Sequence, residues 1–486
     1  MYGKLLQLAR HTAVYGLGSI ASKLLAIILL PVYVHYLDPS DYGAAEAVLM
    51  LDLFAVAIVK FGLQNSMMRF WYDEKDPARQ DLVIRTVMTF MTVSAGIAAT
   101  VLVACSKPLA NFYLRNPSRD EFIWIAAFGV VCTTIYSTLT SIYRLQKRPG
   151  SFLLASLANI TLSAVFTIVF VIGLDWNAAG LLLGNFMGTF AMIPIVGFVQ
   201  RKYLLPSLGQ GLLRPMLRFG IPTMPMAIAN QGLNLVDRTV LARSAGLTQL
   251  GLYSLGSRIA QIVMLVVIAL QMSWQPFAYS ITDDDEARAT YAEVMSWFVA
   301  AIGWLVVAAS LLAEPLVRIA TRPAYYDAAR AVPLLALAAG IYGVYFIAGI
   351  GAGRVKKTGY HVVVAASALG TSIAANLLLV PRFGVMGAAT AAVLANSMLS
   401  GAMVIRAQRV FPVPYQVGRI LRATAIILLL AGLPYLLAPT GAASWSIRVL
   451  LVGVYPMILV AVGFVPAREL RAIGRRLKAR RLRTSE

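Results

Sequence analysis

The chain has 486 residues, of which 59% are hydrophobic and 13% are charged, and its mean hydropathy is +0.74. This composition excludes a soluble globular protein and predicts an all-α protein that crosses a membrane many times. The net charge of +21 does not indicate a nucleic-acid partner, because the Lys and Arg residues stand in short clusters between apolar segments, as in loops that orient membrane helices.

Nothing in the sequence predicts an enzyme or a metalloprotein. No loop between the apolar segments is longer than about 20 residues, which leaves no room for an extramembrane catalytic domain. The two cysteines, Cys105 and Cys132, and the three histidines are widely separated and suggest neither a disulfide framework nor a metal site. We therefore expect no catalytic residue and no metal, and we expect the protein to act within the membrane.

Apolar segments of about 20 residues, enough to cross a hydrocarbon core of ~30 Å, recur along the chain. Six are predicted at residues 12–36, 43–66, 83–104, 121–143, 151–174 and 178–200. After a basic connector, six more are predicted at residues 218–242, 250–277, 291–312, 328–352, 360–380 and 385–405. A last pair at residues 419–438 and 447–465 brings the prediction to about 14 transmembrane helices.

The two groups of six carry similar motifs in the same order. Tyr42-Gly43 and Leu250-Gly251 open the second helix of each group, and two further turns repeat at a spacing of roughly 207 to 210 residues. This repeat predicts two six-helix lobes in a pseudo-two-fold relation around a central cavity, although similar loops could also recur through topology alone. The predicted units are two lobes, a helix pair and a basic tail, at residues 1–210, 211–410, 411–466 and 467–486.

The basic residues are distributed unequally between the two sides of these segments. About 29 of the 42 Lys and Arg residues fall on the side that holds both termini, and about nine fall on the other. The more basic side is cytoplasmic by the positive-inside rule. We therefore expect both termini in the cytoplasm.

Several ionisable side chains lie inside the predicted helices, where a charge costs at least ~2.5 kcal/mol. Lys23 and Arg258 lie about 9 to 11 residues from a helix end, which places both near the middle of the bilayer. Lys60 is expected in the cytoplasmic third, and Asp237 and Arg238 near the periplasmic end of their helix. Because such groups usually face a bundle interior or a wet cavity, they are candidates for handling a substrate or an ion.

Three stretches of the sequence resemble the bacterial oligosaccharide and polysaccharide flippases of the O-antigen type. They read HTAVYGLGSIASKLLAIILLPVYVHYLDPSDYGAAEAV, FGIPTMP with NLVDRTVLARSAGLTQLGLYSLGSRIA, and LLLVPRFGVMGAATAAVLAN. The turn YLDPSDYG is the most specific piece, and in it Asp38 stands where these flippases more often have Gly. The resemblance covers essentially the whole chain and extends to the lipid II flippases and MATE exporters, which belong to the same multidrug, oligosaccharidyl-lipid and polysaccharide exporter superfamily.

This resemblance implies a flippase that translocates an undecaprenyl-pyrophosphate-linked oligosaccharide across the bacterial cytoplasmic membrane by alternating access, for export of O-antigen, capsule or exopolysaccharide. The two lobes would face each other across a cationic cavity, and no covalent bond would be made or broken. The partners would be the lipid-linked oligosaccharide, membrane lipids and polysaccharide-assembly proteins, and the chain would act as a monomer.

On this view, the intramembrane cations bind the pyrophosphate and nearby neutral groups bind sugar hydroxyls. Arg presents a planar pair of donors to phosphate oxygens, whereas Lys acts as a point charge. The candidate residues for substrate binding are Lys23, Lys60, Arg238, Arg258, Gln231, Asn234, Gln261 and Gln271. Structural roles also fit them, as ion pairs, as snorkelling side chains or as hydrogen bonds between helices.

Asp237 and Asp52 are the intramembrane carboxylates that we select for coupling transport to a proton or a sodium ion, as in an antiporter with no other cofactor. Either could instead neutralise Lys23 or Arg258. Because adjacent helical residues point about 100° apart, we expect one of Asp237 and Arg238 to face the cavity and the other to face the bilayer rim.

Two other transporters fit the same sequence: a MATE-like cation-coupled exporter of small molecules, and a lipid II flippase. An exporter of organic cations should favour carboxylates in its cavity, whereas we select four basic and two acidic intramembrane groups. A membrane polymerase or ligase would need a large loop with catalytic side chains. We therefore predict the polysaccharide flippase.

Overall fold

The described part of the chain is helical throughout. The computed structural model describes residues 30–209, 211–355, 360–433 and 442–464, and these ranges contain no strand. Within them, nine helices are long and apolar enough to cross a membrane. The predicted all-α membrane fold is confirmed, while the count of 14 helices stays a prediction because residues 1–29 lie outside this description.

The helices follow the predicted apolar segments in order. The first lobe contains α2 (Leu30–Tyr36), α3 (Pro39–Val59), α4 (Leu63–Asp73), α5 (Pro77–Ala104), α6 (Ser106–Leu114), α7 (Glu121–Leu145), α8 (Pro149–Ile168) and α9 (Asn177–Val199). After α10 (Leu213–Gly220), the second lobe contains α11 (Met224–Ser244), α12 (Leu247–Ser280), α13 (Asp284–Ala320), α14 (Val332–Arg354) and α15 (Tyr360–Val410). The last pair is α16 (Val417–Gly432) and α17 (Ala442–Ala461).

The helix α15 covers two predicted segments. It is interrupted at Gly384, whose φ of 52° and ψ of −126° are not helical. This conformation requires glycine because a side chain is strained at positive φ.

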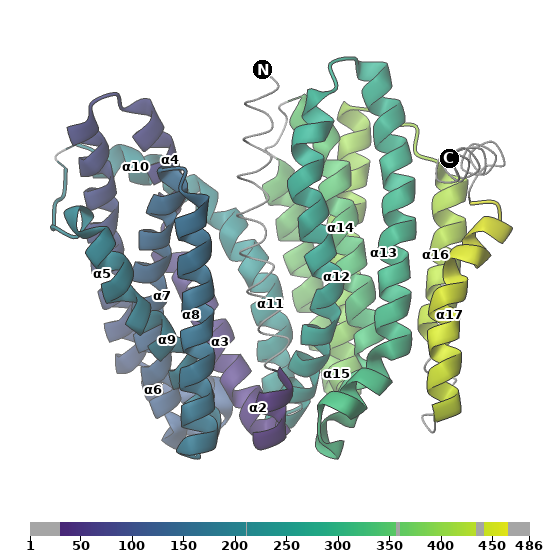
Figure 1. Cartoon of the computed structure of the whole chain (residues 1–486), viewed down its shortest axis with the longest axis horizontal. Coiled ribbons are helices and arrows are strands. Elements are labelled where there is room, and N and C mark those ends of the chain that lie inside the picture. Colours follow the sequence, from purple (N-terminus) through teal and green to yellow (C-terminus); the bar gives the residue numbers. More distant parts are fainter. Residues whose placement is uncertain (1–29, 210, 356–359, 434–441, 465–486) are drawn as a thin grey trace, which may run out of the picture.

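The two lobes stand side by side and meet mainly along α3 of the first lobe. In Figure 1, α5, α7, α8 and α9 lie on one side, α12 to α15 lie on the other, and α16 and α17 form the outer edge. The helix α3 packs against α7 within its own lobe and against α11 and α12 of the second lobe. We call the contact of α3 with α11 and α12 the lobe seam.

Two glycines make the lobe seam tight. A Cβ on Gly43 of α3 would lie 2.0 Å from the carbonyl oxygen of Leu247, and a Cβ on Gly251 of α12 would lie 1.9 Å from that of Pro39. Leu247 lies four residues before Gly251, and Pro39 lies four residues before Gly43. The same contact is therefore made twice with the two helices exchanged, as a two-fold relation requires. These are the glycines that open the second helix of each sequence repeat.

Backbone breaks alter two of the predicted helices. The segment predicted at residues 43–66 is interrupted at Gly62, which has a φ of 67° and lies between α3 and α4. A Cβ on Gly62 would lie 2.2 Å from the carbonyl oxygen of Gly220, so α10 packs directly on this break. A short 3-10 turn containing Pro222 precedes α11, because proline removes a backbone donor. Hydropathy alone does not reveal such breaks.

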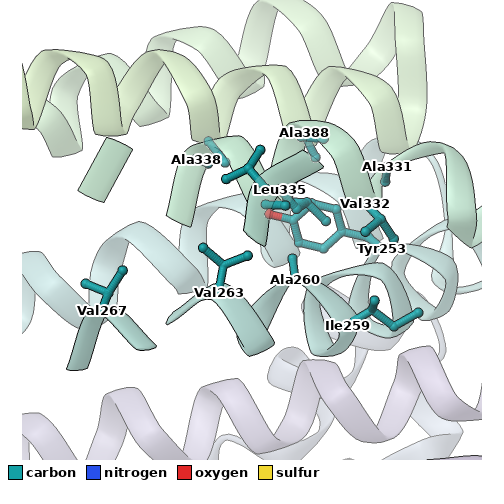
Figure 2. Close-up of a cluster of buried hydrophobic side chains, with 14 of the residues drawn as sticks. Tyr253, Ile259, Ala260, Val263, Val267, Ala331, Val332, Leu335, Ala338 and Ala388 are labelled. Carbon is teal, nitrogen blue, oxygen red and sulfur yellow. The ribbon is translucent and has the colours of Figure 1, made fainter. Parts of the chain in front are cut away.

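The core of the second lobe lies between α12 and α14. Figure 2 shows the ring of Tyr253 close to Val332 and Leu335 of α14, with Ala260 and Val263 of α12 beside it. All five side chains are buried. This packing fixes the orientation of the Tyr253 ring, whose hydroxyl donates to a carboxylate of α11.

Candidate substrate site

A cavity of about 460 Å³ lies at the lobe seam, where α3 faces α11, α12, α14 and α15. We call it the seam cavity. Its lining includes half of the ten residues predicted for substrate binding or coupling: Gln231, Asn234, Asp237, Arg238 and Gln261. The fold therefore brings together polar side chains of α11 and α12 at the boundary between the lobes.

A second cavity, of about 240 Å³, lies among α2, α3, α8, α9 and α12. We call it the α8–α9 cavity. Arg258 and Glu46 line it together with Asn159 and Asn185, and Gln261 lines both this cavity and the seam cavity. The two predicted residues Arg258 and Gln261 thus connect the second lobe to polar groups of the first.

Glu46 of α3 binds two arginines across the lobe seam. Its Oε1 accepts a hydrogen bond of 2.8 Å from Arg258 of α12, and its Oε2 lies 3.7 Å from an Nη atom of Arg238 of α11. Glu46 is 1% exposed and Arg238 is 7% exposed. Pairing of this kind offsets part of the large cost of removing each charge from water. We call these three residues the lobe-bridging triad.

The Arg238 side of the triad is incompletely satisfied. Arg238 Nε and Glu46 Oε2 are buried, and neither has a hydrogen-bond partner within the described part of the chain. The Arg258 side chain is 27% accessible even though it is paired with Glu46. Both guanidinium groups can therefore donate further hydrogen bonds to a ligand that carries several acceptor oxygens.

Glu46 was not among the residues selected from the sequence, and it changes the expected charge of the cavity. The prediction counted four basic and two acidic intramembrane groups without Glu46, and the family resemblance implied a cationic cavity. In the described linings, Glu46 pairs with Arg258, and the carboxylate of Asp237 lines the seam cavity next to Arg238 in the chain. The described linings are therefore balanced in charge. The signal was present in the sequence, because Glu46 interrupts the same apolar run as Asp52.

Arg238 and Asp237 both line the seam cavity and both are buried, so the expectation that one of them faces the bilayer rim is wrong. Asp237 accepts hydrogen bonds from Tyr253 of α12 at 3.0 Å, and from Ser372 and Asn376 of α15 at 3.2 and 2.7 Å. Asn376 Oδ1 is buried without a hydrogen-bond partner among the described residues. Three helices of the second lobe thus converge on one carboxylate.

The other predicted residues lie elsewhere. Lys60 at the end of α3, Asp52 within α3 and Gln271 of α12 do not belong to the lining of the seam cavity or of the α8–α9 cavity. Asp52 is 3% exposed, and its Oδ1 has no hydrogen-bond partner in the described ranges. Lys23 lies outside the described residues, as does the predicted basic tail.

A third cavity, of about 310 Å³, lies between α13, α14 and α16. Its lining is almost entirely apolar, with residues such as Phe298, Ile302, Val344 and Ile420. Such a lining suits a hydrocarbon chain and does not suit a sugar, because sugar hydroxyls would be left without partners.

The sequence pattern of the family described as "Polysaccharide biosynthesis protein" matches residues 34–330. The chain belongs to this family. It is also similar to the Lsg locus putative protein 1 of Haemophilus influenzae, with 22% identity over 278 residues. That match covers 56% of this chain and 65% of the relative, so the chain spans less than two thirds of that relative's length.

Solved structures of transporters share the fold. The lipid II flippase MurJ, in an inward closed conformation, has a TM-score of 0.75 at 13% identity, over 94% of this chain and 99% of that one. The Vibrio cholerae MATE transporter VcmN has a TM-score of 0.57 at 18% identity, over 83% of this chain and 96% of that one. The chain is therefore a multi-pass membrane protein of the polysaccharide biosynthesis family, and it shares its fold with these solved transporters.

Proposed function

We propose that this chain flips an undecaprenyl-pyrophosphate-linked oligosaccharide across a bacterial cytoplasmic membrane by alternating access, for export of a surface polysaccharide. The observation that carries the proposal is the lobe-bridging triad, in which the buried Arg238 and the partly buried Arg258 lie between the lobes of a flippase fold. Family membership supports the polysaccharide class of the substrate. The chain would act as a monomer, with both termini in the cytoplasm, alongside the proteins that assemble the polymer.

The diphosphate would bind by taking the place of Glu46. Arg258 and Arg238 then exchange one carboxylate for several phosphate oxygens, and Arg238 Nε, which is otherwise unpaired, gains an acceptor. When the substrate leaves, Glu46 returns to the arginines and prevents two unpaired charges from remaining buried. The arginines therefore keep an anionic partner in both the empty and the loaded protein.

The described conformation is closed at one end of the lobe seam. Arg322 and Tyr325, which follow α13, both donate to the carbonyl oxygen of Leu37 before α3, at 2.8 and 3.0 Å. Arg243 of α11 donates to the carbonyl oxygen of Phe112 of α6 at 3.2 Å. In the predicted orientation, this end faces the periplasm. Release of the substrate would require these contacts between the lobes to open.

The remaining parts of the substrate fit the other features of the fold. Gln231, Asn234 and Gln261 offer neutral donors and acceptors to sugar hydroxyls in the seam cavity. The apolar cavity beside α16 would hold part of the polyprenyl chain, which otherwise stays in the lipid. Asp237, held by donors from α12 and α15, is the candidate that couples transport to a proton or a sodium ion.

The test is flipping by the full-length protein in proteoliposomes. An undecaprenyl-diphosphate oligosaccharide is incorporated, and its arrival at the outer leaflet is measured with a membrane-impermeant glycan oxidase. Arg258→Ala and Arg238→Ala should each slow flipping about 10- to 100-fold, because hydrogen bonds to charged groups contribute roughly 1.5–3 kcal/mol. Arg79→Ala is the matched control, because its side chain is 68% accessible and lies outside both cavities.

Three outcomes would contradict the proposal. Flipping by the wild-type protein that does not exceed the rate of protein-free liposomes would exclude a flippase for this lipid. Unchanged rates in both arginine variants would exclude the triad as the diphosphate site. Faster transport of lipid II or of an organic cation such as ethidium would favour one of the two alternative transporters.

A further inference from the structure

We propose that the α8–α9 cavity is a subsite for the neutral sugar that is joined directly to the diphosphate. The inference rests on the proposed function, because it takes the diphosphate to bind at the lobe-bridging triad. It adds a second region of contact, in which the first lobe contributes neutral residues of α8 and α9 that were not selected from the sequence.

The lining of this cavity is rich in neutral hydrogen-bonding groups. Asn159 and Ser163 come from α8, Asn185 comes from α9, and Tyr33 and Tyr42 come from α2 and α3. Amide and hydroxyl groups of this kind match the alternating donors and acceptors of sugar hydroxyls. A hydrocarbon chain does not fit here, because each buried polar group left unpaired costs about 1–3 kcal/mol.

Charge in the lining selects a neutral ligand. Among the described residues that line this cavity, Glu46 and Arg258 are the charged ones, and they pair with each other at 2.8 Å. In the described conformation, an organic cation would find a carboxylate that already binds two arginines. A second anion would find a guanidinium that the diphosphate already occupies. A neutral polar ring meets neither obstacle.

The position of the cavity identifies which sugar it receives. Gln261 lines both cavities, and Arg258 of the triad lies at the edge of the α8–α9 cavity. When the diphosphate is bound at the triad, the part of the substrate that reaches the α8–α9 cavity is therefore the sugar joined directly to the diphosphate. The volume of about 240 Å³ is equivalent to about eight water molecules, enough for one ring and too small for an oligosaccharide.

Tyr42 places a buried hydroxyl beside the lobe-bridging triad. Its side chain is 1% exposed and lines the cavity, and its hydroxyl lies next to Glu46 and Arg258. A buried hydroxyl costs free energy unless it has a partner. When the diphosphate takes the place of Glu46, a sugar hydroxyl in the cavity supplies a partner for Tyr42.

The wall formed by α8 and α9 is preorganised. A Cβ on Gly184 would lie 2.4 Å from Cα of Thr167, and a Cβ on Gly188 would lie 2.3 Å from the backbone nitrogen of Ser163. Small residues at this spacing let the two helices approach closely, as in other membrane helix pairs. The Asn159 amide also donates to Thr189 across the pair at 3.1 Å. The wall can therefore recognise a ring without rearranging.

The test compares the binding of two kinds of lipid to the full-length protein in nanodiscs. One probe is undecaprenyl diphosphate, and the others are the same lipid carrying a single glucose, galactose or N-acetylglucosamine. At least one sugar-bearing lipid should bind about tenfold more tightly than the bare diphosphate lipid. Asn159→Leu with Asn185→Leu should remove this gain, because two hydrogen bonds of roughly 0.5–1.5 kcal/mol each are lost at similar side-chain volume. Binding of the bare lipid should stay unchanged.

Control variants separate recognition from folding. Thr161→Leu makes a similar change on the exposed face of α8 and should keep the full gain. Asn185→Ala is a milder variant that should lose part of the gain even where the double variant is poorly folded. A glucuronate at the same position should add no affinity, because its carboxylate would meet Glu46.

The outcomes distinguish this inference from the proposed function. If the wild-type protein binds neither the bare lipid nor any sugar-bearing lipid, the proposed function fails. If it binds them all equally, or if the gain survives in the double variant, the diphosphate site stands and the sugar subsite is overturned.

Discussion

Within the described residues, two networks join one glutamate to two arginines, and they differ in where they lie: Glu46 with Arg258 and Arg238, and Glu314 with Arg318 and Arg448. Glu46 binds Arg258 across the lobe seam, while Glu314 of α13 accepts a hydrogen bond of 2.7 Å from Arg448 of α17. Arg448 is 1% exposed and also donates to the carbonyl oxygen of Leu311 at 3.4 Å. The chemistry of the two networks is nearly the same.

Their surroundings give the networks different expected roles. Glu46 and Arg258 come from different lobes and line the α8–α9 cavity. Glu314 and Arg448 do not line the seam cavity, the α8–α9 cavity or the apolar cavity, and they join α17 to the neighbouring helix α13. A buried ion pair in a membrane helix therefore does not by itself indicate a substrate site. A substrate site is indicated where the ion pair also lines a cavity between the two lobes.

The largest expected effect comes from replacing each network with apolar residues. Glu46→Leu with Arg258→Met should reduce flipping at least ~100-fold, because the diphosphate loses charge-assisted hydrogen bonds. Glu314→Leu with Arg448→Met should keep flipping within about twofold, because a buried ion pair can often be replaced by well-packed apolar groups. The measurement is the initial flipping rate per reconstituted protein. An equal loss of flipping in both double variants would mean that the two networks do not differ in their role.

Single truncations should destabilise both networks. Glu314→Ala leaves Arg448 buried without its carboxylate, and Glu46→Ala does the same to Arg258, at a cost of about 3–5 kcal/mol each. Thermal unfolding in detergent should show both losses. Glu314→Leu with Arg448→Met should recover most of the stability, whereas Glu46→Leu with Arg258→Met should recover less, because Arg238 stays buried without Glu46. An undiminished melting temperature in Glu314→Ala would mean that Arg448 finds another partner.

Gly43→Ala tests the seam itself. The added Cβ would lie 2.0 Å from the carbonyl oxygen of Leu247, so the described conformation should lose about 1–3 kcal/mol through overpacking. Crosslinking of a cysteine pair across the seam should fall accordingly. Gly96→Ala on α5 is the control, because a Cβ there meets nothing within 4 Å. Equal crosslinking in the two variants would argue against a tight seam.

Asp237→Asn should change coupling and leave diphosphate binding intact. Asp237 accepts three hydrogen bonds in the seam cavity and forms no salt bridge with Arg258 in the described structure. We expect stimulation of flipping by a sodium or proton gradient to fall roughly tenfold, or about 1.4 kcal/mol. Asp52→Asn, which lies outside both cavities, should respond to the gradient like the wild type. The reverse pattern would move the coupling site to α3.

The smallest effects are expected for predicted residues that the structure places away from both cavities. Lys60→Ala and Gln271→Ala should each change the flipping rate by no more than about twofold, as surface or peripheral substitutions usually do. A tenfold loss in Lys60→Ala would show that the substrate passes the end of α3 during entry.

Much of the fold could be predicted because hydropathy acts along the sequence. Runs of about 20 apolar residues predicted the helices. The paired motifs around Gly43 and Gly251 predicted a duplication, which stays a prediction. The break at Gly62 could not be predicted in this way, because it depends on α10 packing against it. Boundaries set by contact between distant segments are not visible in a local pattern.

The candidate site could be predicted only in part. A charge inside the membrane is costly and usually has a function, and this criterion selected Arg258, Asp237 and Arg238. The same criterion applied to Glu46 would have completed the triad. It could not separate these residues from Asp52, which lies on the same helix as Glu46 and lines neither cavity. The difference lies in which face of α3 meets the second lobe.

The sequence by itself determined that this chain is an all-helical membrane protein, because apolar runs are a local property, and its motif spacing predicted a duplication. The tertiary structure decided which charges pair. Arg258, which the sequence left open as a substrate-binding cation or a member of an ion pair, is the partner of Glu46, and the cavities are balanced rather than cationic in their described linings. The physical reason is that a buried charge is compensated by whichever opposite charge the packing brings within reach, and that partner lay in the other lobe.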